Sequence, residues 1–162
     1  MSVAPVAFRE ALKNFPGGVT VVTTTRADGR PVGATVSAFA SLSLEPPLVV
    51  VCLKDPSRSA LALKQRGAFV VHFLDANQAA LARRFASDLD DKFFDLDYDV
   101  TESGLPVLPD CPHRLECEVY SFAPGGDHLI FIGMVMDTRG RAEFEPLVYA
   151  NRHFFALGAT VE

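Results

Sequence analysis

The chain lacks the sequence signatures of most hydrolases and metalloenzymes. It has no Gly-x-Ser-x-Gly elbow, no His-Glu-x-x-His, no Gly-x-x-x-x-Gly-Lys phosphate loop and no cysteine paired with a nearby histidine. Its four histidines do not have the spacing of metal ligands, and a lone histidine is more often a surface or hydrogen-bonded core residue. These absences argue against hydrolysis and metal-dependent catalysis.

Cysteine and positive charge are also scarce. The three cysteines, Cys52, Cys111 and Cys117, form no CxxC pair, so we expect reduced thiols, with Cys52 and Cys117 as small core residues. A formal net charge of -5 disfavours nucleic acid and anionic membranes as partners, because both attract a basic face.

Long hydrophobic runs are missing as well. No apolar run approaches the roughly 20 residues that span a bilayer, and the first residues show no basic region followed by an apolar block. We therefore expect a cytoplasmic protein without a membrane partner. With 49% hydrophobic and 22% charged residues, the composition is that of a globular protein, and we expect residues 1–162 to form one domain.

What the chain does contain is a series of short extended runs separated by turns. β-Branched or alternating patterns predict strands at 19–25, 32–37, 39–44, 48–53, 68–74, 114–121 and 128–136. The run 48–53 is apolar on both sides, which predicts a strand buried on both faces. Helices are expected at 5–14, at 78–85, and between an N-cap at Ser57 and a stop at Gly67. The pattern is therefore mainly β with short helices.

An acidic segment interrupts this pattern between residues 86 and 112. Its alternate aspartates lack the Gly and Glu positions of an EF-hand loop, so we interpret it as a solvated loop rather than a calcium site. Four large apolar residues lie among these aspartates and predict that the loop folds onto the body or a partner: Phe93, Phe94, Leu96 and Tyr98.

The stretch 33–59 carries the candidate binding groups. In an extended chain Thr35, Ser37 and Ser41 leave one side of the strand, where they could hold the ring or ribityl chain of a cofactor. Ala38 and Phe39 would lie against the face of that ring. The phosphate donors would be Lys54, Ser57 and Ser59, at a helix N-terminus. Taken alone, hydroxyl groups on an edge strand are more often simply solvated.

Five motifs in a fixed order make the chain resemble a known family. They are FPGGVTVVT at 15–23, GATVSAFASLSLEPP at 33–47, RFA at 84–86, GLP at 104–106 and GDH at 126–128. This order resembles the split-barrel flavin reductases, the small components of two-component flavin-dependent monooxygenases, from about Phe8 to Leu157. One departure is Gly17, where the family more often has Thr, which loosens a turn.

The resemblance implies a six-stranded antiparallel Greek-key split β-barrel with flanking helices, the FMN-binding split barrel. It also implies a homodimer that reduces FMN or FAD with NADH or NADPH and supplies a partner oxygenase. By motif, the flavin ring and ribityl segment corresponds to Thr35, Ser37, Ala38 and Ser41, and the phosphate segment to Lys54, Ser57 and Ser59. Arg84 and Phe85 match a further flavin contact, and His128 matches the position that faces the nicotinamide.

Two other interpretations remain open on the sequence. The same barrel could be an electron carrier that holds FMN without turning over NAD(P)H. A pyridoxamine-phosphate-oxidase-like enzyme would need a cluster of basic residues, which the chain does not have near its hydroxyl motif. The sequence also leaves open whether the flavin is FMN or FAD and whether the reductant is NADH or NADPH.

Overall fold

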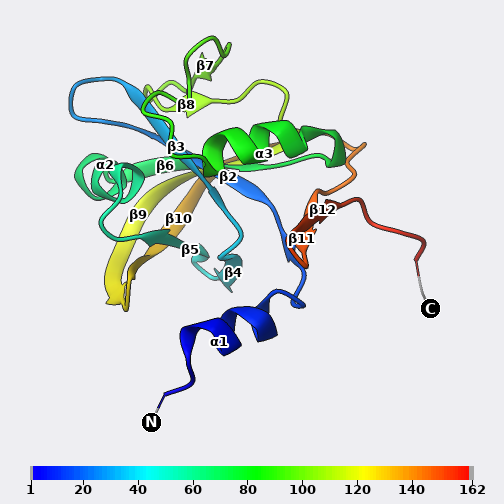
Figure 1. Ribbon diagram of the computed structural model, residues 1–162. Helices are drawn as coiled ribbons and strands as arrows, with labels where there is room; N and C mark the ends of the chain where they lie inside the picture. Colours follow the sequence, from blue (N-terminus) through cyan, green and yellow to red (C-terminus); the bar gives the residue numbers. More distant parts are fainter. Residues whose placement is uncertain (1, 161–162) are drawn as a thin grey trace.

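The computed structural model describes residues 2–160, and Figure 1 shows them as an antiparallel sheet with helices around it. No helix in this described part is long and apolar enough to cross a membrane. The elements are, in chain order, α1 (Pro5–Leu12), β1 (Gly17–Gly18), β2 (Thr20–Thr25), β3 (Pro31–Val36), β4 (Phe39–Leu44), β5 (Pro47–Lys54), α2 (Arg58–Arg66), β6 (Ala68–Phe73), the 3-10 helix η1 (Ala76–Gln78), α3 (Ala79–Ala86), β7 (Asp99–Val100), β8 (Pro106–Val107), β9 (His113–Gly125), β10 (His128–Gly140), β11 (Val148–Ala150) and β12 (His153–Phe155).

Seven antiparallel strands form the main sheet, in the order β3-β2-β6-β9-β10-β5-β4. The two outermost strands, β3 and β4, are consecutive in the chain and are joined by Ser37 and Ala38 alone. The sheet must therefore curl until its edges approach each other. The expected mainly β fold with helices is confirmed, but the expected count of six strands is wrong, because β4 pairs along β5 and adds a seventh strand at the edge.

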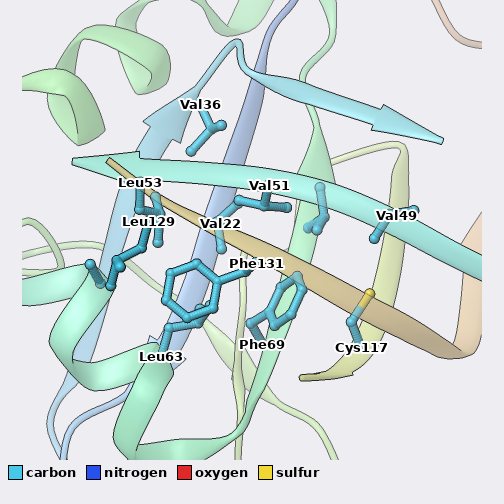
Figure 2. Close-up of a cluster of buried hydrophobic side chains, with 12 residues drawn as sticks. Val22, Val36, Val49, Val51, Leu53, Leu63, Phe69, Cys117, Leu129 and Phe131 are labelled. Atoms are coloured by element: carbon cyan, nitrogen blue, oxygen red, sulfur yellow. The ribbon is translucent and has the colours of Figure 1, made fainter. Parts of the chain in front are cut away.

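The interior of the curled sheet holds the larger hydrophobic cluster. Figure 2 shows Phe69 and Phe131 at its centre, with Val51 from β5 above them and Leu63 from α2 below. The same cluster contains Val22 of β2 and Val36 of β3, which lie at the other end of the sheet order from β5, and they meet because the sheet bends around the cluster. At roughly 2 kcal/mol for each large buried apolar side chain, this cluster is the main source of stability.

A second cluster lies on the outer face, beneath α3. Successive residues of β2 point to opposite faces, so Val22 belongs to the inner cluster and Val21 to the outer one. Three threonines of β2, Thr20, Thr23 and Thr24, are buried too, and their hydroxyl groups donate to backbone carbonyl oxygens, for example Thr23 to Pro106 at 2.6 Å and Thr24 to Ala68 at 2.7 Å. A central strand can therefore carry polar side chains without unpaired buried donors.

Strand β5 differs from its prediction. Its buried residues alternate, with Val49, Val51 and Leu53 in the inner cluster, while its other face stays partly exposed. The expectation of burial on both faces is wrong, because only the inner face meets the core. Cys52 lies on the other face and is half-buried, whereas Cys117 is buried as expected.

The helices begin and end close to their predicted positions. Ser57 caps α2 by accepting a hydrogen bond from the backbone N–H of Ala60, and Gly67 ends it in the left-handed conformation with φ 70°. Helix α1 differs from the others, because none of its residues is buried. Figure 1 shows it apart from the sheet, beyond the small sheet of β1, β11 and β12.

Candidate functional site

A cavity of about 620 Å³ opens where β3, the end of β5, the start of α2 and the end of α3 meet. Pockets for small molecules and cofactors occupy a few hundred to about 1,000 Å³, so this one is large enough for a nucleotide-sized ligand. Its wall combines backbone and hydroxyl groups with apolar carbon, and a segment between α3 and β7 closes one side.

Most of the sequence-predicted site residues line this cavity. They are Thr35, Ser37, Ala38, Lys54, Ser57, Ser59, Phe85 and His128. The remaining three, Phe39, Ser41 and Arg84, lie elsewhere in the structure. The expected row of hydroxyl groups is interrupted, because β3 ends at Val36 and the chain enters β4, which pairs with β5 at the far edge of the sheet.

The three residues away from the cavity lie in three different environments. Phe39 lines a smaller apolar hollow, where its ring lies edge-on to Phe73 with centroids 5.6 Å apart. Ser41 is exposed on β4. Arg84 donates from Nε to the carbonyl oxygen of Lys92 at 2.6 Å and also bonds the carbonyl of Phe94, so it holds the segment that follows α3.

One end of the cavity is formed by the N-terminus of α2. The Ser57 hydroxyl accepts from Ala60 N–H at 3.1 Å, and the Ser57 carbonyl accepts from Leu61 N–H at 3.0 Å. The N–H groups of Arg58 and Ser59 therefore have no bond within the helix, as in the first turn of any helix. Together with the exposed Lys54 they form a donor set suited to a phosphate group.

The other end is walled by β3 and α3. The Thr35 hydroxyl is already used, since it donates to the Ala82 carbonyl of α3 at 2.6 Å. Phe85 of α3 lies directly on β3, where a Cβ atom at Gly33 would be 2.8 Å from its Cε1. A planar ring entering here would lie against Phe85 and the backbone from Gly33 to Ala38.

His128 also lines the cavity. It begins β10 directly opposite Lys54 of β5, and its Nδ1 lies 2.8 Å from Oδ1 of Asp127. This hydrogen bond holds the pKa of Asp127 below its ordinary value. The Asp55 N–H donates to the Asp127 carbonyl at 2.9 Å, which fixes the β9–β10 turn beside the end of β5.

The sequence did not identify the wall formed by residues 87–92. Ser87, Asp88, Leu89, Asp90 and Lys92 line the cavity, and so does Arg58 from the opposite side. Within this acidic segment Phe93 is buried and stacks edge-on against Phe85 at 5.1 Å, which confirms that the loop folds onto the body.

Lys92 anchors the end of this wall. Its half-buried Nζ donates to the Phe85 carbonyl at 2.7 Å, and burial lowers the pKa of this lysine. No pattern of spacing marks this wall in the sequence. The alternation of aspartates resembles any solvated loop, and Arg58 stands between two serines that attract attention first.

The geometry fits a phosphorylated ligand with a planar polar ring. A helix end suited to a phosphate group and a wall of β3 backbone with Phe85 line one cavity of sufficient volume. Within residues 2–160, no three His, Cys, Asp or Glu side chains lie close enough together to hold a metal ion.

Comparison with protein-family models finds a match to the flavin reductase like domain over residues 12–158. Among curated proteins, the chain is 38% identical over 148 residues to "Flavin-dependent monooxygenase, reductase subunit HsaB" of Rhodococcus jostii (strain RHA1), covering 91% of this chain and 75% of that one. It is also 38% identical over 148 residues to "FMN reductase (NADH) SmoA" of Agrobacterium fabrum (strain C58 / ATCC 33970), covering 91% and 83%. A match to a longer relative from Rhizobium meliloti (strain 1021) spans 81% of this chain and 42% of that protein.

Solved structures agree with this family match. The NADH:FAD oxidoreductase SgcE6 of Streptomyces globisporus C-1027, in complex with NAD and FAD fragments, superposes with a TM-score of 0.90 at 32% identity. The match covers 100% of this chain and 99% of that one, so the two folds correspond along their whole length.

Proposed function

The chain belongs to the flavin reductase-like family, and we propose that it is an NAD(P)H:flavin oxidoreductase, which reduces FMN or FAD and supplies the reduced flavin to a partner monooxygenase. The observation that carries this proposal is the single cavity lined by the α2 N-terminus, by β3 with Phe85 packed on Gly33, and by His128. The names of the relatives support the nicotinamide, the flavin and the monooxygenase partner.

The residues divide into two groups along the cavity. Lys54, Ser57 and Ser59 hold the flavin phosphate at the start of α2. The ring and the ribityl chain lie along Thr35, Ser37 and Ala38, with Phe85 against them. The hydroxyl of Thr35 serves α3, so its contribution to the ligand is one of shape. A flavin contact from Phe39, Ser41 or Arg84 stays a prediction.

A bound flavin supplies the ring that accepts a hydride from the nicotinamide, so the chain needs no nucleophile of its own. The protein contributes position and electrostatics. Backbone N–H groups of the link at Ser37 and Ala38 stabilise negative charge at the ring edge. His128, held by Asp127 at 2.8 Å, positions the nicotinamide beside the cavity.

An enzyme assay tests this proposal against the electron-carrier alternative. NADH absorbance is followed with free FMN in large excess over the protein. A reductase consumes many equivalents of NADH per protein, whereas a carrier consumes one and stops. Repeating the assay with FAD and with NADPH then identifies the preferred pair.

We further propose that the chain works as a homodimer. The helix α1 buries none of its residues yet exposes Val6, Phe8 and Leu12, and Leu44 on the edge strand is 90% exposed. Isolated helices shorter than about 12 residues are marginal in water, so α1 needs a surface to pack on. Light scattering after size-exclusion chromatography tests this, since a monomeric mass contradicts it.

Three predictions accompany this proposal. Residues 1–162 act as one domain, and the protein is located in the cytoplasm. The curled sheet is the split barrel of the family, because the edge strands β3 and β4 are consecutive in the chain.

A further inference from the structure

Arg58 connects the two sides of the cavity mouth. It is the first residue of α2, and its guanidinium reaches the segment that follows α3. Nη1 donates to the carbonyl oxygen of Asp90 at 2.9 Å and to its Oδ1 at 2.7 Å, while Nη2 donates to the carbonyl oxygen of Leu89 at 2.8 Å. Both Leu89 and Asp90 line the cavity, as does Arg58 itself.

The wall has few other attachments at this point. Its ends are held by α3, through the Ser87 hydroxyl on the Arg84 carbonyl at 2.7 Å and through Lys92 on Phe85. Between these ends, the hydrogen bonds found within residues 2–160 that tie Leu89 and Asp90 to another element all come from Arg58. Leu89 is 53% exposed, so apolar packing does not replace them. Without Arg58 the middle of the wall would be free to move outward.

We propose that Arg58 is a positioning residue that straps residues 87–92 across the flavin cavity, and so strengthens flavin binding. This inference rests on the proposed function. The planar guanidinium suits the task, because its fixed fork of donors can bond two successive carbonyls and a carboxylate at once. A lysine ammonium has the same charge but not this geometry.

The alternative role for the same side chain is a direct contact with the flavin phosphate, since Arg58 stands between Ser57 and Ser59. The two roles differ in what they predict for the affinity of riboflavin, which is FMN without its phosphate. A strap acts on the wall and affects both ligands alike. A phosphate contact affects FMN and leaves riboflavin unchanged.

The experiment measures dissociation constants of FMN and riboflavin by quenching of flavin fluorescence, for wild type, Arg58→Ala and Arg58→Lys. The matched control is Arg66→Ala. Arg66 lies on the same helix and donates to a loop carbonyl, Ser103 at 2.6 Å, but does not line the cavity. The unfolding midpoint of each ligand-free variant shows how far the substitution destabilises the fold as such.

The strap predicts that Arg58→Ala weakens both ligands alike, by about threefold to tenfold. The bonds to the two backbone carbonyls carry this effect, because the carboxylate of Asp90 is fully exposed and water screens its bond to Arg58. Arg58→Lys behaves like Arg58→Ala, and Arg66→Ala leaves both constants within about twofold of wild type. Backbone amide exchange in residues 88–91 becomes faster in Arg58→Ala and not in Arg66→Ala.

Three results would overturn the strap while leaving the proposed function intact. They are a loss of affinity for FMN alone, full rescue by Arg58→Lys, and equal effects of Arg58→Ala and Arg66→Ala. If the wild-type protein bound neither flavin, the proposed function itself would be wrong, and the strap with it.

Discussion

Replacing His72 should change how the stability of the protein depends on pH. His72 lies in β6 and is fully buried. Its Nδ1 is 3.0 Å from the carbonyl oxygen of Val21, and its Nε2 accepts a hydrogen bond from the N–H of Leu108 at 3.1 Å. Nδ1 therefore carries the proton, and the neutral ring ties β2 to the segment after β8.

Burial lowers the pKa of His72 from 6.5 to about 4. The unfolded chain therefore binds a proton at this site near pH 6.5, whereas the folded chain binds it only near pH 4. In this window the unfolded state holds more protons, so the free energy of unfolding falls as the pH falls. His72 costs nothing near pH 8, and at about pH 5 it reduces the free energy of unfolding by roughly 2 kcal/mol.

The variant His72→Gln removes the titration and keeps one donor and one acceptor. Near pH 8 we expect it to be less stable than wild type by about 1–3 kcal/mol, because a buried hydrogen bond is lost or distorted. Between about pH 8 and pH 5, its free energy of unfolding should fall by roughly 2 kcal/mol less than that of wild type. The double difference cancels the contributions of all other titrating groups.

Urea unfolding followed by circular dichroism measures both free energies, since the chain contains no tryptophan for fluorescence. All samples are kept at one protein concentration. The control is His153→Gln, which removes an exposed histidine. A double difference below about 0.5 kcal/mol would mean that His72 titrates normally in the folded protein, and the argument from burial would be refuted.

Three other perturbations follow from the structure. Gly133→Ala should lower the free energy of unfolding by roughly 3 kcal/mol in urea titrations, because the added methyl group would overlap the buried ring of Phe69. The control Gly18→Ala adds a methyl group in open space and should change the free energy of unfolding little. Equal losses in the two variants would contradict the prediction. Burial raises the pKa of the Cys111 and Cys117 thiols to about 12, so near pH 8 iodoacetamide should label Cys52 first. Bound FMN should slow the labelling of Cys52, because Cys52 lines the cavity. If peptide mass spectrometry showed the same labelling rate with and without FMN, the flavin would not bind in this cavity. His128→Ala should raise KM for the nicotinamide or slow flavin reduction in stopped-flow assays, while the flavin dissociation constant stays nearly constant; unchanged reduction kinetics would exclude His128 from the site.

The local patterns in the sequence identified the strands better than the resemblance did. Seven extended runs were predicted from β-branched and alternating residues, and each coincides with a strand of the main sheet. The count of six came from the family, and it is wrong for this chain. Caps at Ser57 and Gly67 were also predictable, because capping depends on a few neighbouring residues.

Burial was harder to predict than secondary structure. The run 48–53 is apolar throughout, but which of its faces meets the core depends on how the sheet curls, and that depends on strands far away in the sequence. The same reason explains Cys52. Cys52 is a small residue within an apolar run and was expected in the core, yet it lines the cavity on the other face of β5.

The site was predicted where short motifs carry it and missed where the tertiary fold assembles it. Lys54, Ser57 and Ser59 lie within six residues of each other, so the phosphate end was visible in the sequence. The wall of residues 87–92 comes from another part of the chain, about thirty residues beyond Arg58, with which it forms three hydrogen bonds. Single-sequence patterns carry no information on such a contact.

Two positions of β3 connect the fold to this site. Gly33 has no side chain, and a Cβ there would lie 2.8 Å from Cε1 of Phe85 and 3.0 Å from the carbonyl oxygen of Val22, so glycine is what lets Phe85 rest on the strand. Two residues on, Thr35 donates to the Ala82 carbonyl at 2.6 Å. Both contacts hold the same helix, α3, and the wall begins where that helix ends. The position of the wall over the cavity is therefore set by β3, the strand that also lines the cavity.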